Sequence, residues 1–183
     1  MNIGYIATTL DGYIADTQGQ VLFLDQFQNI DTGYDHFIQK IDAIVMGKNS
    51  YEAILGFNIE WPYEKQKTWI ITQDHTLPKA HPSIEFWHGD LRSLLTYISA
   101  IRLDNCWLLG GGALISSAIK KGLLDQLELF VMPVLLGKGI PLFPEAKHAL
   151  VTLELESLTS IGQCISHHKY RLKREKIEED DDV

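Results

Sequence analysis

Two apolar, strand-like stretches of this sequence run through glycine directly into a stretch with the pattern of a helix. The first, 42–47, ends at Gly47, and the second, 105–109, is followed by the three consecutive glycines Gly110–Gly112. A buried strand that passes at once into a helix is the βα unit of parallel sheets, in which helices cover a layer of strands. The two junctions therefore predict an α/β fold.

Strand and helix signals alternate as far as residue 124. We expect strands at 3–8, 42–47, 67–72, 83–88 and 105–109, and helices at 34–41, 48–55, 90–102 and from the three glycines to Gly122. Strand-like stretches then follow one another at 125–136, 151–157 and 163–174, and strands without helices between them pair largely antiparallel. The expected fold is a mixed sheet, with parallel βα units first and antiparallel C-terminal strands, in a three-layer α/β/α arrangement.

Local patterns predict helix starts and buried faces. Asp31 and Thr32 are placed to cap helix 34–41, and Asp90 is placed to cap helix 90–102. That second helix has an apolar stripe expected to face the core, formed by Leu91, Leu94, Leu95, Ile98 and Ile101. In segment 151–157 three apolar residues alternate with polar ones, which predicts a strand buried on one face through Val151, Leu153 and Leu155.

Length, charge and cysteine usage exclude several classes of protein. The 183 residues suit one domain, expected at 1–174, and a net charge of −8 argues against a nucleic-acid surface. Residues 178–182 are all acidic, so 175–183 is expected to be an acidic, disordered tail. Two cysteines without a C-x-x-C spacing indicate a reducing compartment and no metal site. Without a basic leader or a bilayer-length apolar stretch, a cytoplasmic protein without membrane contact is expected.

The glycine junctions also suggest a binding function. Free N–H groups and the positive end of the helix dipole gather at a helix start, and glycine lets a phosphate approach the backbone. Gly110–Gly112 match neither G-x-G-x-x-G nor a Walker loop, and an ordinary tight turn explains them equally well. However, Lys48–Ser50 after Gly47, and a third strand end at Thr72, would meet these glycines at the carboxyl edge of the sheet. Together these three strand ends predict a dinucleotide site.

Four segments carry a family resemblance: "ATTLDGYIAD" at 7–16, "VMGKNSYEAI" at 45–54, "LLGGGALISSAIKKGLLDQLEL" at 108–129 and "PVLLGKGIPLF" at 133–143. Their order and spacing resemble the dihydrofolate reductase superfamily, most of all the reductase half of the bifunctional riboflavin-biosynthesis deaminase-reductase. The resemblance covers roughly residues 2–173. It implies a mixed eight-stranded sheet flanked by four helices, with NADPH as the hydride donor.

The resemblance also implies contacts to this cofactor. Gly110 and Gly111 match a glycine pair that often has a cis peptide bond between them, and Gly112 begins the helix at the pyrophosphate. Lys48 stands where the family usually has an arginine, and it lacks the planar fork that binds phosphate with two hydrogen bonds. Thr72 matches a hydroxyl residue near the adenosine 2′-phosphate. The implied cofactor residues are Ala7, Ile14, Gly47, Lys48, Asn49, Ser50, Thr72, Gly110, Gly111, Gly112, Ala113 and Leu114.

The catalytic residues are less marked. Asp31 lies near the position of the carboxylate of dihydrofolate reductases, and Asp11 could contact substrate, but a helix cap and an Asp-Gly turn explain both. The family's substrate-loop tryptophan has no clear match, because the corresponding segment offers Phe23 instead. The leading hypothesis is an NADPH-dependent reductase of a pyrimidine-like or pteridine-like heterocycle, related to riboflavin or folate metabolism. The alternatives are a dinucleotide-binding protein without catalysis and a purely structural domain.

A homodimer is also expected. The resemblance suggests it, and segment 133–143 offers more apolar surface than a short loop usually leaves in water. The apolar residues of this segment are Leu135, Leu136, Ile140, Leu142 and Phe143. The alternative is that the segment folds back onto its own sheet.

Overall fold

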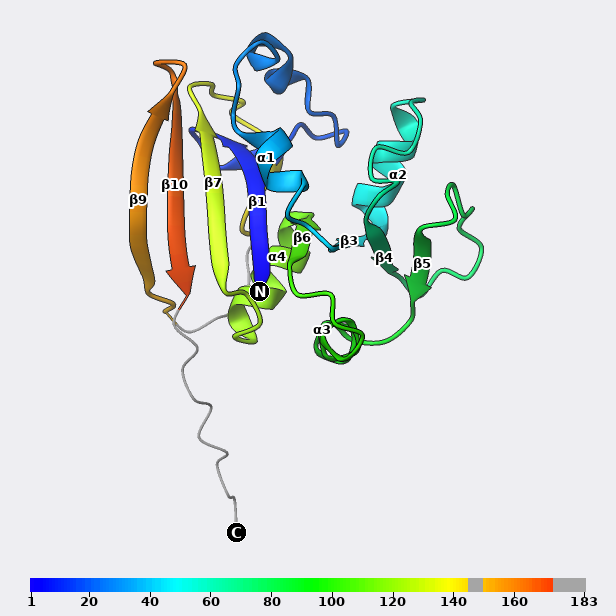
Figure 1. Cartoon of the computed structure of the whole chain (residues 1–183). Coiled ribbons are helices and arrows are strands. Elements are labelled where there is room, and N and C mark those ends of the chain that lie inside the picture. Colours follow the sequence, from blue (N-terminus) through cyan, green and yellow to red (C-terminus); the bar gives the residue numbers. More distant parts are fainter. Residues whose placement is uncertain (145–149, 173–183) are drawn as a thin grey trace.

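A twisted sheet runs through the molecule, with helices on both of its faces (Figure 1). The computed structural model describes residues 1–144 and 150–172. The strands are β1 (Asn2–Thr9), β2 (Tyr13–Ala15), β3 (Ala43–Gly47), β4 (Lys67–Ile71), β5 (Ile84–Trp87), β6 (Cys106–Gly110), β7 (Gln126–Met132), β8 (Ile140–Pro141), β9 (Leu153–Ile161) and β10 (Ile165–Leu172). The helices are α1 (Tyr34–Ile38), α2 (Lys48–Gly56), α3 (Leu91–Ala100), α4 (Gly112–Lys120) and the 3-10 helix η1 (Leu22–Phe27).

The order of the strands confirms the predicted mixed sheet. Eight strands pair in the order β5-β4-β3-β6-β1-β7-β10-β9, and β2 pairs with β8 in a separate ribbon. All pairs from β5 to β7 are parallel, whereas β10 runs antiparallel to both β7 and β9. Parallel βα units therefore build one half of the sheet, and the C-terminal hairpin completes the other.

Alternating side chains of the central strands separate the core into two sides. In β3, Ala43 and Val45 pack with α3 and α4, while Ile44 and Met46 pack with α2 on the opposite face. The period-2 alternation of a strand places such neighbours on opposite faces, so a continuous apolar run is required where helices cover both. This is the three-layer α/β/α arrangement expected from the sequence.

Two predicted helix starts have different outcomes. Asp90 caps α3 as predicted, because its side chain accepts a hydrogen bond from the Ser93 N–H. The prediction that Asp31 and Thr32 cap the first helix is wrong, because α1 begins after Gly33, whose φ of 77° is left-handed. Asp31 Oδ1 instead accepts the Gly33 N–H at 2.8 Å and forms the turn before the helix.

Two predicted buried faces are also corrected. Ile101 lies just beyond the end of α3 and is exposed, although the other residues of its stripe are buried. In β9, Leu155 is exposed and Leu153 is only half-buried, and Val151 before the strand is exposed as well. β9 is the last strand of the sheet, and no helix lies between β7 and β10 in the described part of the chain to supply the covering layer that the alternation predicted. The acidic segment 175–183 lies outside the described residues, and the domain limits 1–174 stay a prediction.

Candidate functional site

The carboxyl ends of the parallel strands lie at one edge of the sheet, at the top of Figure 1. Gly47 ends β3, Gly110 ends β6, and Thr72 directly follows β4. Because β4, β3 and β6 are neighbours in the sheet, these three ends lie side by side. The structure therefore brings together the strand ends that the sequence proposed as one site.

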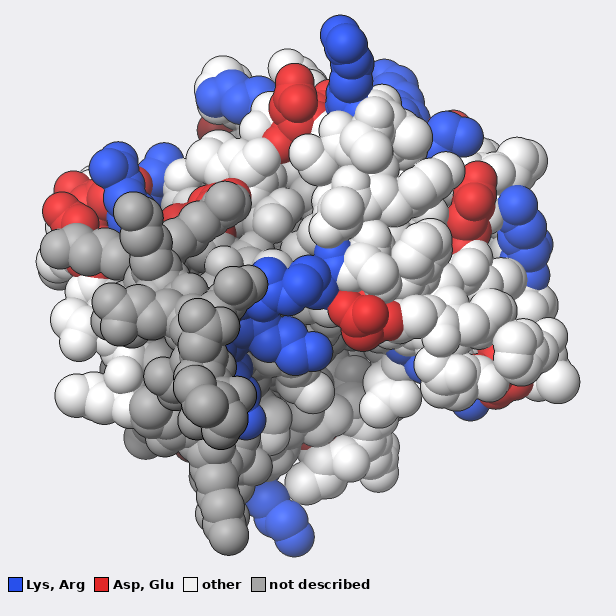
Figure 2. Space-filling model, turned by 90° about the horizontal axis from the view of Figure 1, so that it is seen from below, with Lys and Arg blue, Asp and Glu red and all other residues white. Residues whose placement is uncertain are grey.

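A hollow of about 750 Å³ lies at the opposite end, below the amino ends of β1 and β6. Figure 2 shows this underside, where Lys and Arg side chains gather near the middle of the face. Met1, Arg92, Lys121 and Asp125 are among the residues that line the hollow. The strand ends described above do not reach it, so this hollow is separate from the candidate site.

The three consecutive glycines have three different structural roles. Gly110 has a φ of 126°, a conformation that side chains rarely adopt, and the peptide bond that joins it to Gly111 is cis. A Cβ on Gly112 would collide with the carbonyl oxygen of Leu142 and lie 2.7 Å from that of Pro141. At Gly111 a Cβ would meet nothing closer than the Ser50 hydroxyl at 3.6 Å and Ile14 at 3.8 Å. Backbone geometry and packing therefore account for Gly110 and Gly112, but neither accounts for Gly111.

Two helix starts flank Gly111. α2 begins after Gly47 and α4 begins after Gly111, and both of these N-cap residues are extended and make no side-chain cap. Neither helix has an acidic residue in its first turn, and a Cβ placed on Gly47 would meet no atom within 4 Å apart from its chain neighbours. N–H groups of a first turn have no partner within their helix, and the helix dipole makes the surrounding potential positive. This arrangement fits the diphosphate of a dinucleotide.

The other residues that the resemblance assigns to the cofactor lie at different places relative to Gly111. Ile14 and Ser50 lie beside Gly111, as the contacts above show, and Asn49 and Ala113 lie on the first turns of their helices. Ala7 lies in β1 opposite Phe130 of β7 and is half-buried. Leu114 packs partly into the core behind α4. The assignment of these residues to a cofactor stays a prediction.

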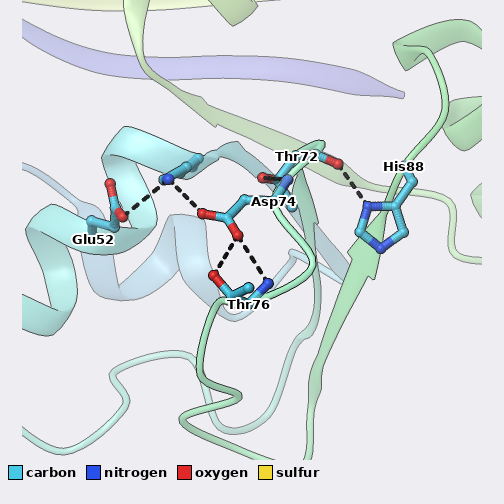
Figure 3. A network of polar contacts seen from close by, with 6 residues as sticks. Glu52, Thr72, Asp74, Thr76 and His88 are labelled. Atoms are coloured by element: carbon cyan, nitrogen blue, oxygen red, sulfur yellow. Dashed lines mark hydrogen bonds and ion pairs between the residues drawn. The ribbon is translucent and has the colours of Figure 1, made fainter.

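Lys48, the first residue of α2, is held by the carboxylate of Asp74, which follows β4 and which the sequence analysis did not single out (Figure 3). Its Nζ donates to Asp74 Oδ2 at 2.6 Å and lies 3.6 Å from Glu52 Oε1. Asp74 Oδ1 accepts from the Thr76 N–H at 2.9 Å and the Thr76 hydroxyl at 2.6 Å. Thr72, buried at the strand end, accepts the Asp74 N–H through its own hydroxyl.

This network affects the charges of its members. The hydrogen bond from Lys48, and then those from Thr76, hold the pKa of Asp74 well below its usual range. The same bond to Asp74 raises the pKa of Lys48. Both groups therefore stay charged near neutral pH, with the lysine already paired. Asp74 could have been noticed as an acid that follows a buried strand, because such residues bind ribose in dinucleotide folds.

Asp11 joins two loops in the structure. Its carboxylate accepts the Thr9 hydroxyl at 2.6 Å, the Gly137 N–H at 2.7 Å and the Leu136 N–H at 3.1 Å. The hydrogen bond from Thr9, and those from the two backbone groups, lower the pKa of Asp11. These contacts favour the structural interpretation of Asp11, as a link between the 9–12 turn and the loop that follows β7.

We expect Asp11→Asn to lower the melting temperature near neutral pH, because the amide cannot replace the carboxylate for all three donors. A folded-state pKa that is lowered means that the carboxylate stabilises the fold above the unfolded pKa, of about 4. This contribution is lost as the pH falls through the folded-state value. The difference in melting temperature between wild type and variant should therefore shrink in acid. Glu60→Gln, at an exposed loop position, is the control; a difference that does not change with pH would contradict the assignment.

Within residues 1–144 and 150–172, no group of His, Cys, Asp or Glu is arranged to hold a metal ion. None of the helices in that part of the chain has the length and apolarity needed to cross a membrane. Both cysteines are free thiols; Cys106 is buried in β6 and Cys164 is exposed in the turn before β10.

Comparisons with known proteins bear on the family and the fold of the chain. The chain is 30% identical over 170 residues to the uncharacterized protein YwjB of Bacillus subtilis (strain 168), covering 91% of this chain and 95% of YwjB. A candidate riboflavin biosynthesis protein from Shewanella sp. PV-4 superposes with a TM-score of 0.85 at 28% identity, over 94% of this chain and 99% of that one.

Dihydrofolate reductase from Enterococcus faecalis, solved with NADP(H), has the same fold. Its TM-score is 0.65 at 14% identity, over 94% of this chain and 96% of the reductase. Residues 60–166 match the sequence model of the RibD C-terminal domain, and this segment includes Thr72, Asp74 and all three glycines of the β6–α4 junction. The resemblance found in the sequence is thereby confirmed: the chain belongs to the RibD C-terminal domain family and has the dihydrofolate-reductase-like fold.

Proposed function

We propose that this protein is a reductase that transfers hydride from a reduced nicotinamide dinucleotide to a small pyrimidine-like or pteridine-like heterocycle. The observation that carries the proposal is the position of Gly111 between two uncapped helix starts, where the nearest atom to the place of a Cβ is the Ser50 hydroxyl at 3.6 Å. Membership of the RibD C-terminal domain family supports a reductase related to riboflavin biosynthesis. The resemblance implies NADPH, and the residues at the adenosine end discriminate between NADPH and NADH.

The residues of the chain have distinct roles in this proposal. The first-turn N–H groups of α2 and α4 bind the diphosphate, and glycine at 111 lets it approach. Ala7 in β1 and Ile14 in β2 position the nicotinamide end of the dinucleotide. Thr72, Lys48 and Asp74 surround the adenosine ribose. The bound dinucleotide supplies the hydride, while the protein orients it and provides the path for a proton.

Asp31 is the proposed proton-handling carboxylate. Asp11 is bound by three hydrogen-bond donors, and its lowered pKa makes it a poor acid near neutral pH. Asp31 is exposed and uses one oxygen for the Gly33 N–H, so its second oxygen is available to a substrate or a water molecule. In this role Asp31→Asn should reduce kcat and leave dinucleotide binding unchanged.

Binding and turnover measured separately test the proposal. NADPH and NADH are titrated against the protein by calorimetry. Oxidation of whichever dinucleotide binds is then followed in the presence of dihydrofolate and of pyrimidines that carry a ribose phosphate. Binding together with steady oxidation supports a reductase. Binding without oxidation of either dinucleotide by any substrate supports the dinucleotide-binding alternative, and no binding at millimolar concentration removes both.

The proposal includes a homodimer that forms through the segment after β7. Leu142 is buried and Leu136 packs against its own domain, but Leu135, Ile140 and Phe143 are exposed. Exposed apolar groups of this kind often mark association. We therefore expect a dimer in sedimentation equilibrium at micromolar concentration, and monomers for Phe143→Asp.

Leu155→Asp, on the edge strand β9, is the matched control for an exposed apolar residue elsewhere. A wild-type protein of monomer mass would exclude the dimer. Dissociation by the control variant alone would move the interface to β9.

A cytoplasmic location is also part of the proposal.

A further inference from the structure

Asp74 lies where the adenosine ribose of the proposed dinucleotide would be bound, so this inference rests on the proposed function. It is two residues beyond Thr72 at the carboxyl end of β4, and β4 is separated from β6 by β3 alone. Neighbouring strands are about 4.8 Å apart, so the β4 end is roughly 10 Å from Gly110, across the row of strand ends. A dinucleotide with its diphosphate over Gly111 reaches that distance with its adenosine half.

The contacts of Asp74 hold the carboxylate in one orientation. Oδ1 accepts both Thr76 donors, and Oδ2 accepts Lys48 Nζ (Figure 3). A carboxylate has about four lone-pair sites on its two oxygens, so one site on Oδ2 remains for another donor. The side chain of Asp74 is 28% exposed, so a ligand can reach it. Asp74 is therefore an ordered acceptor with a free position.

The charge around this position is negative. Lys48 is the one lysine or arginine that forms an ion pair with Asp74 in the described part of the chain, and Glu52 lies on the other side of its ammonium group. One cation thus stands between two carboxylates. A ribose 2′-phosphate carries a charge of about −2 and would have to displace Asp74 from Lys48 while lying against it.

A ribose hydroxyl has the opposite requirement. It donates a hydrogen bond, carries no charge and can use the free site on Oδ2 without disturbing the pair with Lys48. In the Rossmann fold, which also binds its dinucleotide at the carboxyl ends of parallel strands, an acidic residue binds the 2′-hydroxyl of NAD, whereas an arginine accommodates the 2′-phosphate of NADP. We propose that Asp74 is the residue that determines cofactor specificity in this protein, and that with Lys48 paired to it the site prefers NADH over NADPH.

Calorimetric titration of the whole protein with NADH and with NADPH, without substrate, tests this inference. Wild type should bind NADH about 10-fold more tightly, in the range expected for one charge conflict at a partly exposed site. Asp74→Asn keeps the shape and one acceptor for Thr76 but removes the charge and releases Lys48. This variant should bind NADPH about 10-fold more tightly than wild type does and NADH a few-fold more weakly. Adding Lys48→Ala to Asp74→Asn should cancel the gain for NADPH.

Glu52→Gln is the matched control, because it removes a carboxylate that also faces Lys48 but lies 3.6 Å from its ammonium nitrogen, whereas Asp74 lies at 2.6 Å. It should change the NADPH to NADH ratio by less than half of the effect of Asp74→Asn on a logarithmic scale. Thermal melting of each variant checks that the fold is intact. Wild type that prefers NADPH, or an unchanged ratio in folded Asp74→Asn, overturns the inference while the proposed function stands. No binding of either dinucleotide to wild type overturns both.

Discussion

Gly112→Ala should remove much of the protein's stability, with a loss of about 3 kcal/mol in the free energy of unfolding and a melting temperature lowered by roughly 9 °C. The added Cβ would overlap the carbonyl oxygen of Leu142 and lie 2.7 Å from that of Pro141. Both are backbone atoms, and Leu142 N donates to Gly12 O, so the 141–142 segment cannot move without losing its own hydrogen bond. Thermal and denaturant melting measure the effect.

Gly56→Ala is the matched control, because Gly56 is also a helical glycine but has no neighbouring atom within 4 Å of the position that a Cβ would take. Alanine is favoured over glycine in a helix, so this variant should be neutral or slightly stabilising. If Gly112→Ala melts like Gly56→Ala, the 141–142 segment does not pack against α4, and the explanation of Gly112 is wrong.

The parallel half of the fold could be predicted because its signals are local. Gly47 marks the end of a buried strand and the start of a helix, and Asp90 supplies the hydrogen-bond acceptor that α3 needs, both within a few residues. The burial of the edge strand β9 was harder to predict. The alternation of Leu153 and Leu155 indicates that both lie on one face of the strand, but not whether a layer of helices covers that face. No helix lies between β7 and β10 in the described part of the chain to supply such a layer.

The candidate site was predicted in part for the same reason. The strand ends at Gly47, Thr72 and Gly110 are visible in the sequence, and the parallel order brings them together. Lys48 and Asp74 are 26 residues apart, and their ion pair depends on the fold. Asp11 likewise binds backbone groups 125 and 126 residues away, so the sequence indicated an Asp-Gly turn or a substrate contact but not this link.

Gly111→Val should abolish dinucleotide binding, and Gly111→Ala should weaken it at least about 10-fold. Gly111 has a φ of −66° and a ψ of −166°, an extended conformation open to any residue, and its Cβ position makes only ordinary contacts with Ser50 and Ile14. Alanine therefore fits the protein, but its methyl group occupies the space between the starts of α2 and α4. Calorimetric titration with NADH and with NADPH measures the loss of affinity, which should be equal for the two dinucleotides.

The comparison with Gly112 makes this result specific. Gly111→Ala should melt within a few degrees of wild type and lose affinity, whereas Gly112→Ala should lose stability first, since its contacts are with the protein's own backbone. The equal loss for both dinucleotides also separates Gly111 from Asp74, whose substitution changes their ratio, because the diphosphate is common to NADH and NADPH. Full affinity in a folded Gly111→Val protein would place the diphosphate away from the α4 start and remove the observation on which the proposed function depends.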